Sequence, residues 1–148
     1  MVPLIVLIGS FVTMRAFGLA GVAALNNWNT PLRVALFLMF LLTASAHWGR
    51  GRADLLRMVP PIFPRPAMLV SVTGMLEILG AIGLIVSATT RVAAVCLAIL
   101  LVALFPANVR AARERLMILG RPAPKLAVRG AIQIVFLAAL VAVTVHGR

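Results

Sequence analysis

The sequence has few of the residues on which most active sites depend. Among its 148 residues are three acidic side chains, two histidines and one cysteine. The single thiol, Cys96, excludes an internal disulfide and the CxxC pair that dithiol exchange requires. The chain also lacks paired carboxylates, a glycine-rich phosphate loop, metal-ligand spacing and a serine–histidine–acid set. We therefore expect no metal site and no catalytic centre of its own.

Apolar residues, in contrast, make up 63% of the chain, and charged residues only 11%. The mean hydropathy is +1.11. A soluble domain is closer to half apolar and a quarter charged, and a chain this small buries only part of its surface when it folds. The composition thus predicts a membrane protein, with residues 1–148 forming a single membrane domain.

Five apolar stretches are candidates for crossing the lipid bilayer, which takes about 20 helical residues. Backbone polar groups in lipid must be paired within the segment, and this requirement favours helices. The fold class that follows is all-α, a polytopic transmembrane helical bundle. The predicted spans are 2–25, 31–48, 66–87, 91–106 and 126–145.

The net charge of +11 is concentrated in two of the connections between these spans. If the third and fourth segments both cross, the two connections lie on one side, which the positive-inside rule assigns to the cytoplasm. We expect a bacterial cytoplasmic (inner) membrane, with the N-terminus inside and the C-terminus outside. No aromatic–basic platform accompanies the charge, so nucleic acid is not an expected partner. The basic residues are Arg50, Arg52, Arg57 and Arg65, then Arg110, Arg113, Arg115, Arg121 and Lys125.

The two basic connections differ in their expected structure. Four prolines exclude a regular helix from "RMVPPIFPRP" (57–66), which is either an interfacial segment or a stiff linker. The segment "ARERLMIL" (112–119), followed by Gly120 and Pro122, predicts a short interfacial helix that extends the fourth span.

Glu77 is an unusual residue, because it places a carboxyl group inside a glycine-spaced apolar run, "TGMLEILGAIG" (73–83). It follows Pro66 by 11 residues, roughly 16 Å along a helix. Ionisable groups at that depth face the protein interior and suggest a function. Gly74 and Ala81 share its helix face and allow close packing. Two roles are open for Glu77. It either has a structural role, in an ion pair or as a protonated hydrogen-bonding group, or it handles protons or binds a ligand.

Arg15 is the predicted ion-pair partner of Glu77. It is the only basic residue deep within a predicted span, at a comparable depth in "GSFVTMRAFG" (9–18). Pairing the two residues would remove two isolated charges from lipid together.

Three further polar residues are expected near Glu77 towards the basic side. His47 ends the second span, where it is either a proton-relaying or quinone-binding group or an interfacial cap beside Trp48. Asn108 follows Pro106, which should kink the fourth span and free a carbonyl group. Gln133 lies about two turns into the fifth span. Together with Glu77, these residues form the predicted polar pocket.

Four motifs in this order resemble the DoxX family of membrane proteins. They are "RVALFLMFLLTASAHW" (33–48), "MVPP" (58–61), "LVSVTGMLEILGAIGLI" (69–85) and "LFPANVRAA" (104–112). The resemblance implies a four-helix core over 33 to about 145 and an additional N-terminal transmembrane helix. It also implies that Glu77, His47 and Asn108 occupy signature positions, and that a redox-enzyme partner or a quinone is involved.

Two functions of different classes follow from these observations. The first is a non-catalytic membrane subunit or accessory factor of a quinone-linked redox system, with quinone as the candidate cofactor. The second is a small proton-coupled transporter or permease in which Glu77 titrates. A membrane-assembly factor without a ligand is a third, structural alternative. The expected partners are the lipid bilayer and either a redox-enzyme subunit or a second copy of the chain.

Overall fold

In the computed structural model, which describes residues 1–146, the chain is mostly helical, and the predicted helical class is confirmed. A two-stranded hairpin is the exception within the described part of the chain. The elements are α1 (Val2–Leu19), the 3₁₀ turn η1 (Ala23–Leu25), α2 (Asn29–Ser45), α3 (Arg52–Met58), α4 (Pro66–Ile85), α5 (Thr90–Ala103), α6 (Phe105–Arg113), strands β1 (Met117–Ile118) and β2 (Arg121–Pro122), and α7 (Leu126–His146).

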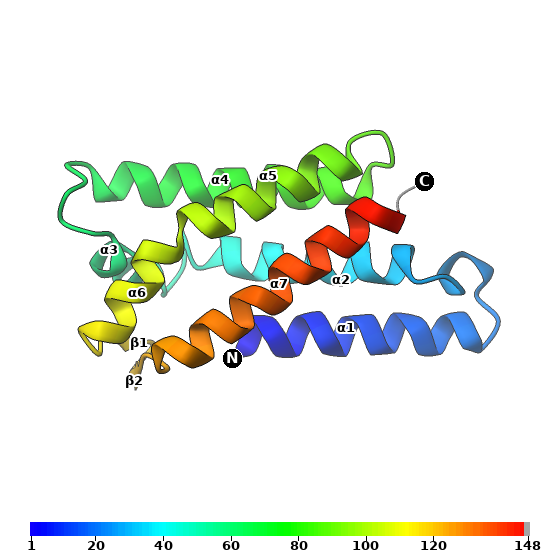
Figure 1. The fold of residues 1–148 in the computed structure, drawn as a ribbon, viewed down its shortest axis with the longest axis horizontal. Coiled ribbons are helices and arrows are strands. Elements are labelled where there is room, and N and C mark those ends of the chain that lie inside the picture. The colour runs from blue at the N-terminus through cyan, green and yellow to red at the C-terminus, as the bar shows by residue number, and fades with distance from the viewer. Residues whose placement is uncertain (147–148) are drawn as a thin grey trace.

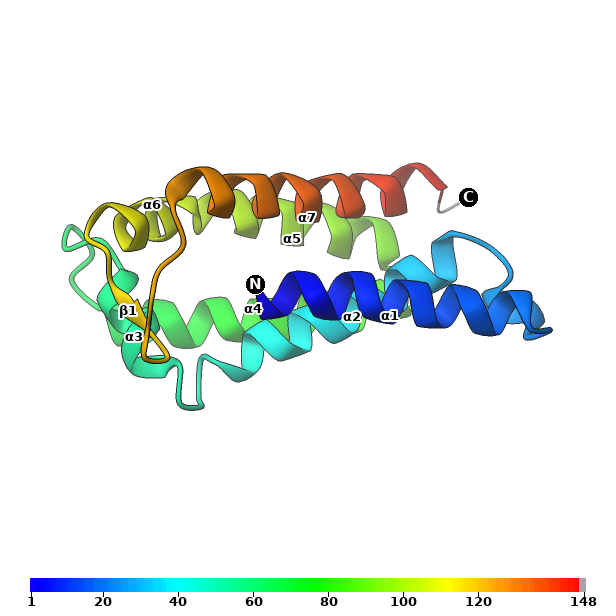
Figure 2. The ribbon, with the colours of Figure 1, turned by 90° about the horizontal axis from the view of Figure 1, so that it is seen from below.

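The long helices run side by side, with α2 at the centre of the packing (Figure 1). α2 contacts α1, α4 and α7, and α5 lies between α4 and α7, so α2, α4, α5 and α7 form a closed ring. Seen from below, α1, α2 and α4 form one layer, and α5, α6 and α7 form the other (Figure 2). The core between these helices contains Leu36, Phe40, Leu84, Leu97 and Leu140, which are buried completely or almost so.

Prolines set the beginnings of two helices. Pro66 is at the start of α4, and Pro106 lies in the first turn of α6, where its missing N–H costs no helical hydrogen bond. The predicted interruption at Pro106 is confirmed, because α5 ends at Ala103 and α6 begins at Phe105. Arg33 of α2 stabilises the other end of α4, donating to the carbonyl oxygens of Leu84 at 2.7 Å and Ile85 at 2.6 Å.

The structure differs from the sequence prediction in three of the connections. α1 ends at Leu19 rather than at residue 25, because Gly21 has a φ of +114°, outside the helical region. Within the first basic connection, residues 52–58 form the helix α3, which the sequence analysis did not predict.

The predicted interfacial helix over 112–119 is also wrong, because α6 stops at Arg113. Arg115 adopts a left-handed conformation with a φ of 49°, and the Leu116 N–H donates to the Ala111 carbonyl oxygen at 3.0 Å. This arrangement is a Schellman motif, which closes the helix. The chain then turns at Leu119 and Gly120, which both have positive φ values, and forms the β1–β2 hairpin.

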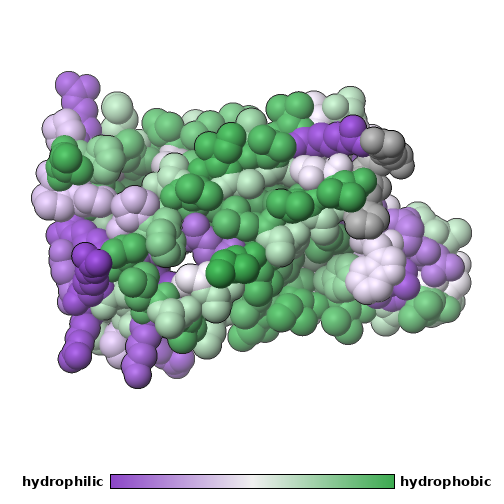
Figure 3. All heavy atoms as spheres, in the orientation of Figure 1, coloured by the Kyte–Doolittle hydropathy of each residue, from purple (hydrophilic) through white to green (hydrophobic). Residues whose placement is uncertain are grey.

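The surface of the bundle is apolar around its middle and hydrophilic at the end that holds α3, α6 and the hairpin (Figure 3). α1, α4, α7 and the continuous stretch Thr90–Arg113 are long and apolar enough to cross a membrane, whereas α2 is shorter. Many large hydrophobic side chains point outward, such as Ile5, Leu79, Ile99 and Ile134. We call the hydrophilic end the basic end, because it contains the arginine-rich connections.

Candidate functional site

Among the described residues, five polar or charged side chains are buried: His47, Asp54, Glu77, Thr90 and Gln133. Three of them belong to the predicted pocket, and Asn108, the fourth predicted residue, is half-buried. The structure distributes these four residues between two separate groups.

The first group is centred on Glu77, whose side chain is only 5% exposed. Glu77 lies on the face of α4 that meets α2, the inward position that its small neighbours predict. Its Oε2 atom is 2.8 Å from the hydroxyl of Thr43 on α2. The same hydroxyl lies 3.0 Å from the Phe40 carbonyl oxygen. Glu77 therefore contacts a hydroxyl group that has a second acceptor within reach.

His47 lies one helical turn beyond Thr43, with its Nδ1 atom 3.2 Å from the Thr43 carbonyl oxygen. A carbonyl oxygen only accepts hydrogen bonds, so this contact requires the proton on Nδ1. The ring packs against Gly74 of α4. A Cβ atom at Gly74 would lie 2.6 Å from His47 Cγ, closer than van der Waals contact allows. Gly74 thus permits the close approach of α2 and α4 beside Glu77.

The predicted ion pair between Arg15 and Glu77 is not formed within residues 1–146. Arg15 lies near the end of α1, where Nη1 donates to the Leu25 and Asn27 carbonyl oxygens at 3.2 Å each. Its guanidinium group also stacks on the ring of Trp28. The physical reason is the packing order, because α1 packs against α2 and α2 separates it from α4. The backbone carbonyls of the connection after α1 take the place of the expected carboxylate.

The second group joins α6 to α7. The Asn108 amide nitrogen is 3.4 Å from Gln133 Oε1, and Gln133 Nε2 donates to the Leu101 carbonyl oxygen at 3.0 Å. Arg129 Nη2 donates to Asn108 Oδ1. Pro106 leaves the Val102 carbonyl, four residues back, without its helical N–H, but the carbonyl that Gln133 bonds to is that of Leu101.

No hydrogen bond among the described residues joins the two groups, and the single polar pocket stays a prediction. The first group connects α2 to α4, whereas the second connects α6 to α7 and the end of α5. The sequence analysis had no means of assigning helix rotation, and rotation decides which residues face one another.

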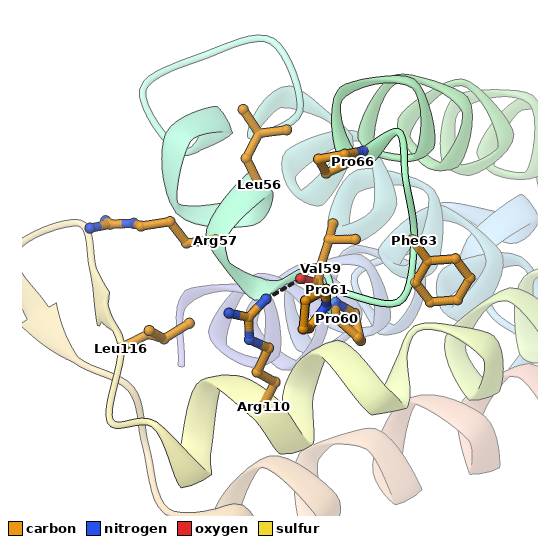
Figure 4. A pocket seen from close by; sticks show the side chains of 9 residues that line it. All are labelled: Leu56, Arg57, Val59, Pro60, Pro61, Phe63, Pro66, Arg110 and Leu116. Carbon is orange, nitrogen blue, oxygen red and sulfur yellow. Dashed lines mark hydrogen bonds between the residues drawn. The ribbon is translucent and has the colours of Figure 1, made fainter.

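A hollow of about 380 Å³ opens at the basic end, between α3, the proline-rich segment and α6 (Figure 4). Pro60, Pro61 and Phe63 form one wall. The Arg110 guanidinium group points to the Val59 carbonyl oxygen and donates a hydrogen bond to it, which holds the segment against α6. The Arg57 side chain extends away from the prolines. Because this segment is anchored and rich in proline, it is a stiff part of the fold.

Asp54 joins α3 to the hairpin at this end. Its Oδ2 atom accepts the Leu119 N–H at 2.8 Å, and its Oδ1 atom accepts a hydrogen bond from Arg57. The Leu119 N–H and then the Arg57 guanidinium group lower the pKa of Asp54, against the opposing effect of burial. The carboxylate is thus ionised and structural, because it holds a turn whose first residue, Leu119, has an unfavourable positive φ.

Two residues of these groups were not predicted from the sequence. Thr43 is a threonine in an apolar run, four residues before His47, and this spacing places both on one helix face. Arg129 lies in the first turn of α7, inside the predicted fifth span, but it was given no role in a polar group. The spacing of Arg129 and Gln133, which is also four residues, is a signal that both face the same neighbour.

These features define a helical bundle with apolar outer surfaces and a buried acidic residue. The chain belongs to the family described as a domain of unknown function (DUF8561), whose profile matches residues 36–146. No curated protein and no solved structure matches the chain.

The predicted DoxX resemblance is wrong, because the family that matches is DUF8561 and DoxX does not match. The four motifs are a histidine at a helix end, a proline pair, a glycine-spaced helix with a glutamate and a proline break before an asparagine. Each feature serves a general need of helix packing, such as close approach at Gly74 or the start of α6 at Pro106. Such features recur in unrelated bundles.

Proposed function

We propose that the chain is an integral membrane protein whose five long helices cross the bilayer, with the basic end on the cytoplasmic side. The apolar outward-facing side chains of the bundle and the four helices of sufficient length support this proposal. α2 has 17 residues, close to the lower limit of about 17 for a span. The concentration of arginine at one end supports the orientation.

Within this membrane protein, we propose that Glu77 is the proton-binding group of a small proton-coupled transporter. The observation that carries the proposal is the buried Glu77 carboxyl group, which is bonded to a neutral hydroxyl. Neither of the ion pairs found in the described chain includes Glu77. An ionisable group buried in a transmembrane bundle marks a proton or substrate path by default.

The contacts of Thr43 give the carboxyl group two stable arrangements. The hydroxyl has a single hydrogen and two acceptors, Glu77 Oε2 and the Phe40 carbonyl oxygen. When Glu77 is ionised, the hydroxyl donates to it. When Glu77 is protonated, its O–H donates to the Thr43 oxygen and the hydroxyl turns to Phe40. Glu77 can therefore gain or lose a proton and keep its hydrogen bond to Thr43 in both protonation states.

Two measurements test this proposal without knowledge of the transported solute. Infrared spectroscopy should show the carbonyl band of a protonated carboxyl group that titrates with pH, and Glu77→Gln should remove it. In liposomes that enclose a pH-sensitive dye, Glu77→Gln should abolish proton entry and Thr43→Val should slow it. Thr73→Val is the matched control, because the Thr73 hydroxyl bonds only to carbonyl groups of its own helix. Proton entry that is unchanged in Glu77→Gln contradicts the transporter proposal.

The role in a quinone-linked redox system stays a prediction from the sequence. Its basis was the DoxX resemblance, which the DUF8561 match replaces. No observation on the described residues favours this role over proton binding at Glu77.

A further inference from the structure

The side chain of Arg129 is a cation whose bonding is incomplete. Its Nη2 atom donates to Asn108 Oδ1, an uncharged partner. Its Nε atom is buried and has no hydrogen-bond partner within the described residues. Gln133, the other polar neighbour in this group, is also uncharged. The guanidinium group of Arg129 is partly buried, and burial penalises a charge that has only neutral partners.

The acidic residues of the chain are all committed elsewhere. The sequence contains three acidic side chains. Asp54 accepts hydrogen bonds from Arg57 and from the Leu119 N–H. Glu114 accepts one from Arg110, and Glu77 is hydrogen-bonded to Thr43. No side-chain carboxylate is therefore left for Arg129. A counter-charge for Arg129 would come from a molecule outside the chain.

The surroundings of Arg129 favour an anion. Arg129 lies in the first turn of α7, at the basic end of the bundle, close in sequence to Arg121 and Lys125. In the space-filling view, hydrophilic atoms border a hollow between α6 and the first half of α7 (Figure 3). The excess of arginine and lysine at this end gives it a positive potential, which concentrates anions.

We propose that Arg129, together with Asn108 and Gln133, forms a binding site for an oxyanion, the phosphate or carboxylate group of a small molecule or lipid. The guanidinium group presents planar donors that match two oxygen atoms of such a group. The Asn108 amide nitrogen, whose bond to Gln133 is long at 3.4 Å, is a further donor beside it. Two kinds of oxyanion fit this position at the start of α7, a phospholipid headgroup and a dissolved anion. The site does not involve Glu77 and does not rest on the proposed transport function.

The test uses the full-length protein in neutral detergent and distinguishes these two kinds of oxyanion. Native mass spectrometry measures retention of phosphatidylglycerol against phosphatidylcholine, and thermal unfolding is followed with inorganic phosphate or acetate added. Preferential retention of phosphatidylglycerol identifies a lipid site, and stabilisation by phosphate or acetate identifies a site for dissolved anions. In Arg129→Gln, whichever effect the wild type shows should weaken at least about ten-fold, because a charge-assisted pair is lost.

Two further variants make the result decisive. Arg113→Gln removes one positive charge from the same end, where the exposed Arg113 side chain makes no hydrogen bond among the described residues, and should leave binding unchanged. Asn108→Asp places a carboxylate against Arg129, so it should raise the unfolding temperature and abolish anion binding. Asn108→Asp also serves if Arg129→Gln does not fold. The proposal is overturned if the wild type responds to none of the probes, if Arg113→Gln loses as much binding as Arg129→Gln, or if Asn108→Asp binds like the wild type.

Discussion

The buried carboxyl groups of Glu77 and Asp54 lie in regions built on different principles. Asp54, at the basic end, accepts hydrogen bonds from a backbone N–H and from an arginine. Glu77, between α2 and α4, meets the hydroxyl of Thr43 beside a helix contact made close by glycine. A backbone N–H and a charged arginine hold the Asp54 carboxyl group in its ionised form, whereas a neutral hydroxyl can bond to Glu77 in both protonation states.

The two regions also differ in what holds their backbone together. At the basic end, arginine side chains donate hydrogen bonds to backbone carbonyl oxygens, as Arg52 does to the His47 carbonyl at 2.6 Å. Around Glu77, the helices satisfy their own backbone groups and meet through small residues such as Ala81, which is fully buried. The basic end is thus held together by hydrogen bonds from arginine side chains, and the bundle interior by the close packing of side chains.

Substitution of Gly74 by valine should disrupt the packing of α4 against α2, with the largest loss of stability among these variants. The added side chain would overlap His47 and Trp48, and such overpacking costs about 1–3 kcal/mol of unfolding free energy. Thermal unfolding in detergent measures the loss. Gly130→Ala is the control, because a Cβ atom at Gly130 meets nothing within 4 Å and the change should stabilise α7 slightly. Equal effects at both glycines would contradict the close approach of α2 and α4.

Substitution of Asp54 by asparagine should loosen the basic end and leave the bundle intact. The neutral amide is a weaker acceptor for the Leu119 N–H and for Arg57, and the expected loss is about 1 kcal/mol. Limited proteolysis near the hairpin should become faster while the helical content stays constant. A variant that unfolds as a whole would show that the two regions are not independent.

Acid should have the same local effect as this substitution. The folded pKa of Asp54 lies below the ordinary carboxyl value of about 4, so its stabilisation is complete above that value. The stabilisation is lost as the pH falls through the lower, folded pKa, because protonation removes the charged acceptor. The amide resonance of Leu119, followed by NMR, should titrate below pH 4 in the wild type only. A titration of this resonance that persists in Asp54→Asn would assign it to another group.

Substitution of Glu77 by glutamine should have the smallest effect on stability, about 0.5 kcal/mol or less, because the amide keeps a hydrogen bond to Thr43. Chemical or thermal unfolding, compared with Asp54→Asn under the same conditions, measures the difference. A larger loss in Glu77→Gln than in Asp54→Asn would reverse the comparison and make the Glu77 charge structural.

The sequence allowed prediction of the helices and of the break at Pro106, because apolar run length and proline act locally. It did not allow prediction of the hairpin after α6, because the left-handed conformation of Arg115 has no glycine or asparagine to signal it. The failure of the Arg15–Glu77 pair has a different cause. Depth along the helices was estimated from residue counts, but the order in which helices pack follows from long-range contacts that no local pattern contains.

The position of α1 makes the ring of helices independent of it. α1 packs mainly against one neighbour, α2, while α2, α4, α5 and α7 contact one another in a closed ring, and the family match starts inside α2. Removal of α1 would therefore uncover one face of α2 and leave in place the contact of α2 with α4 that buries Glu77.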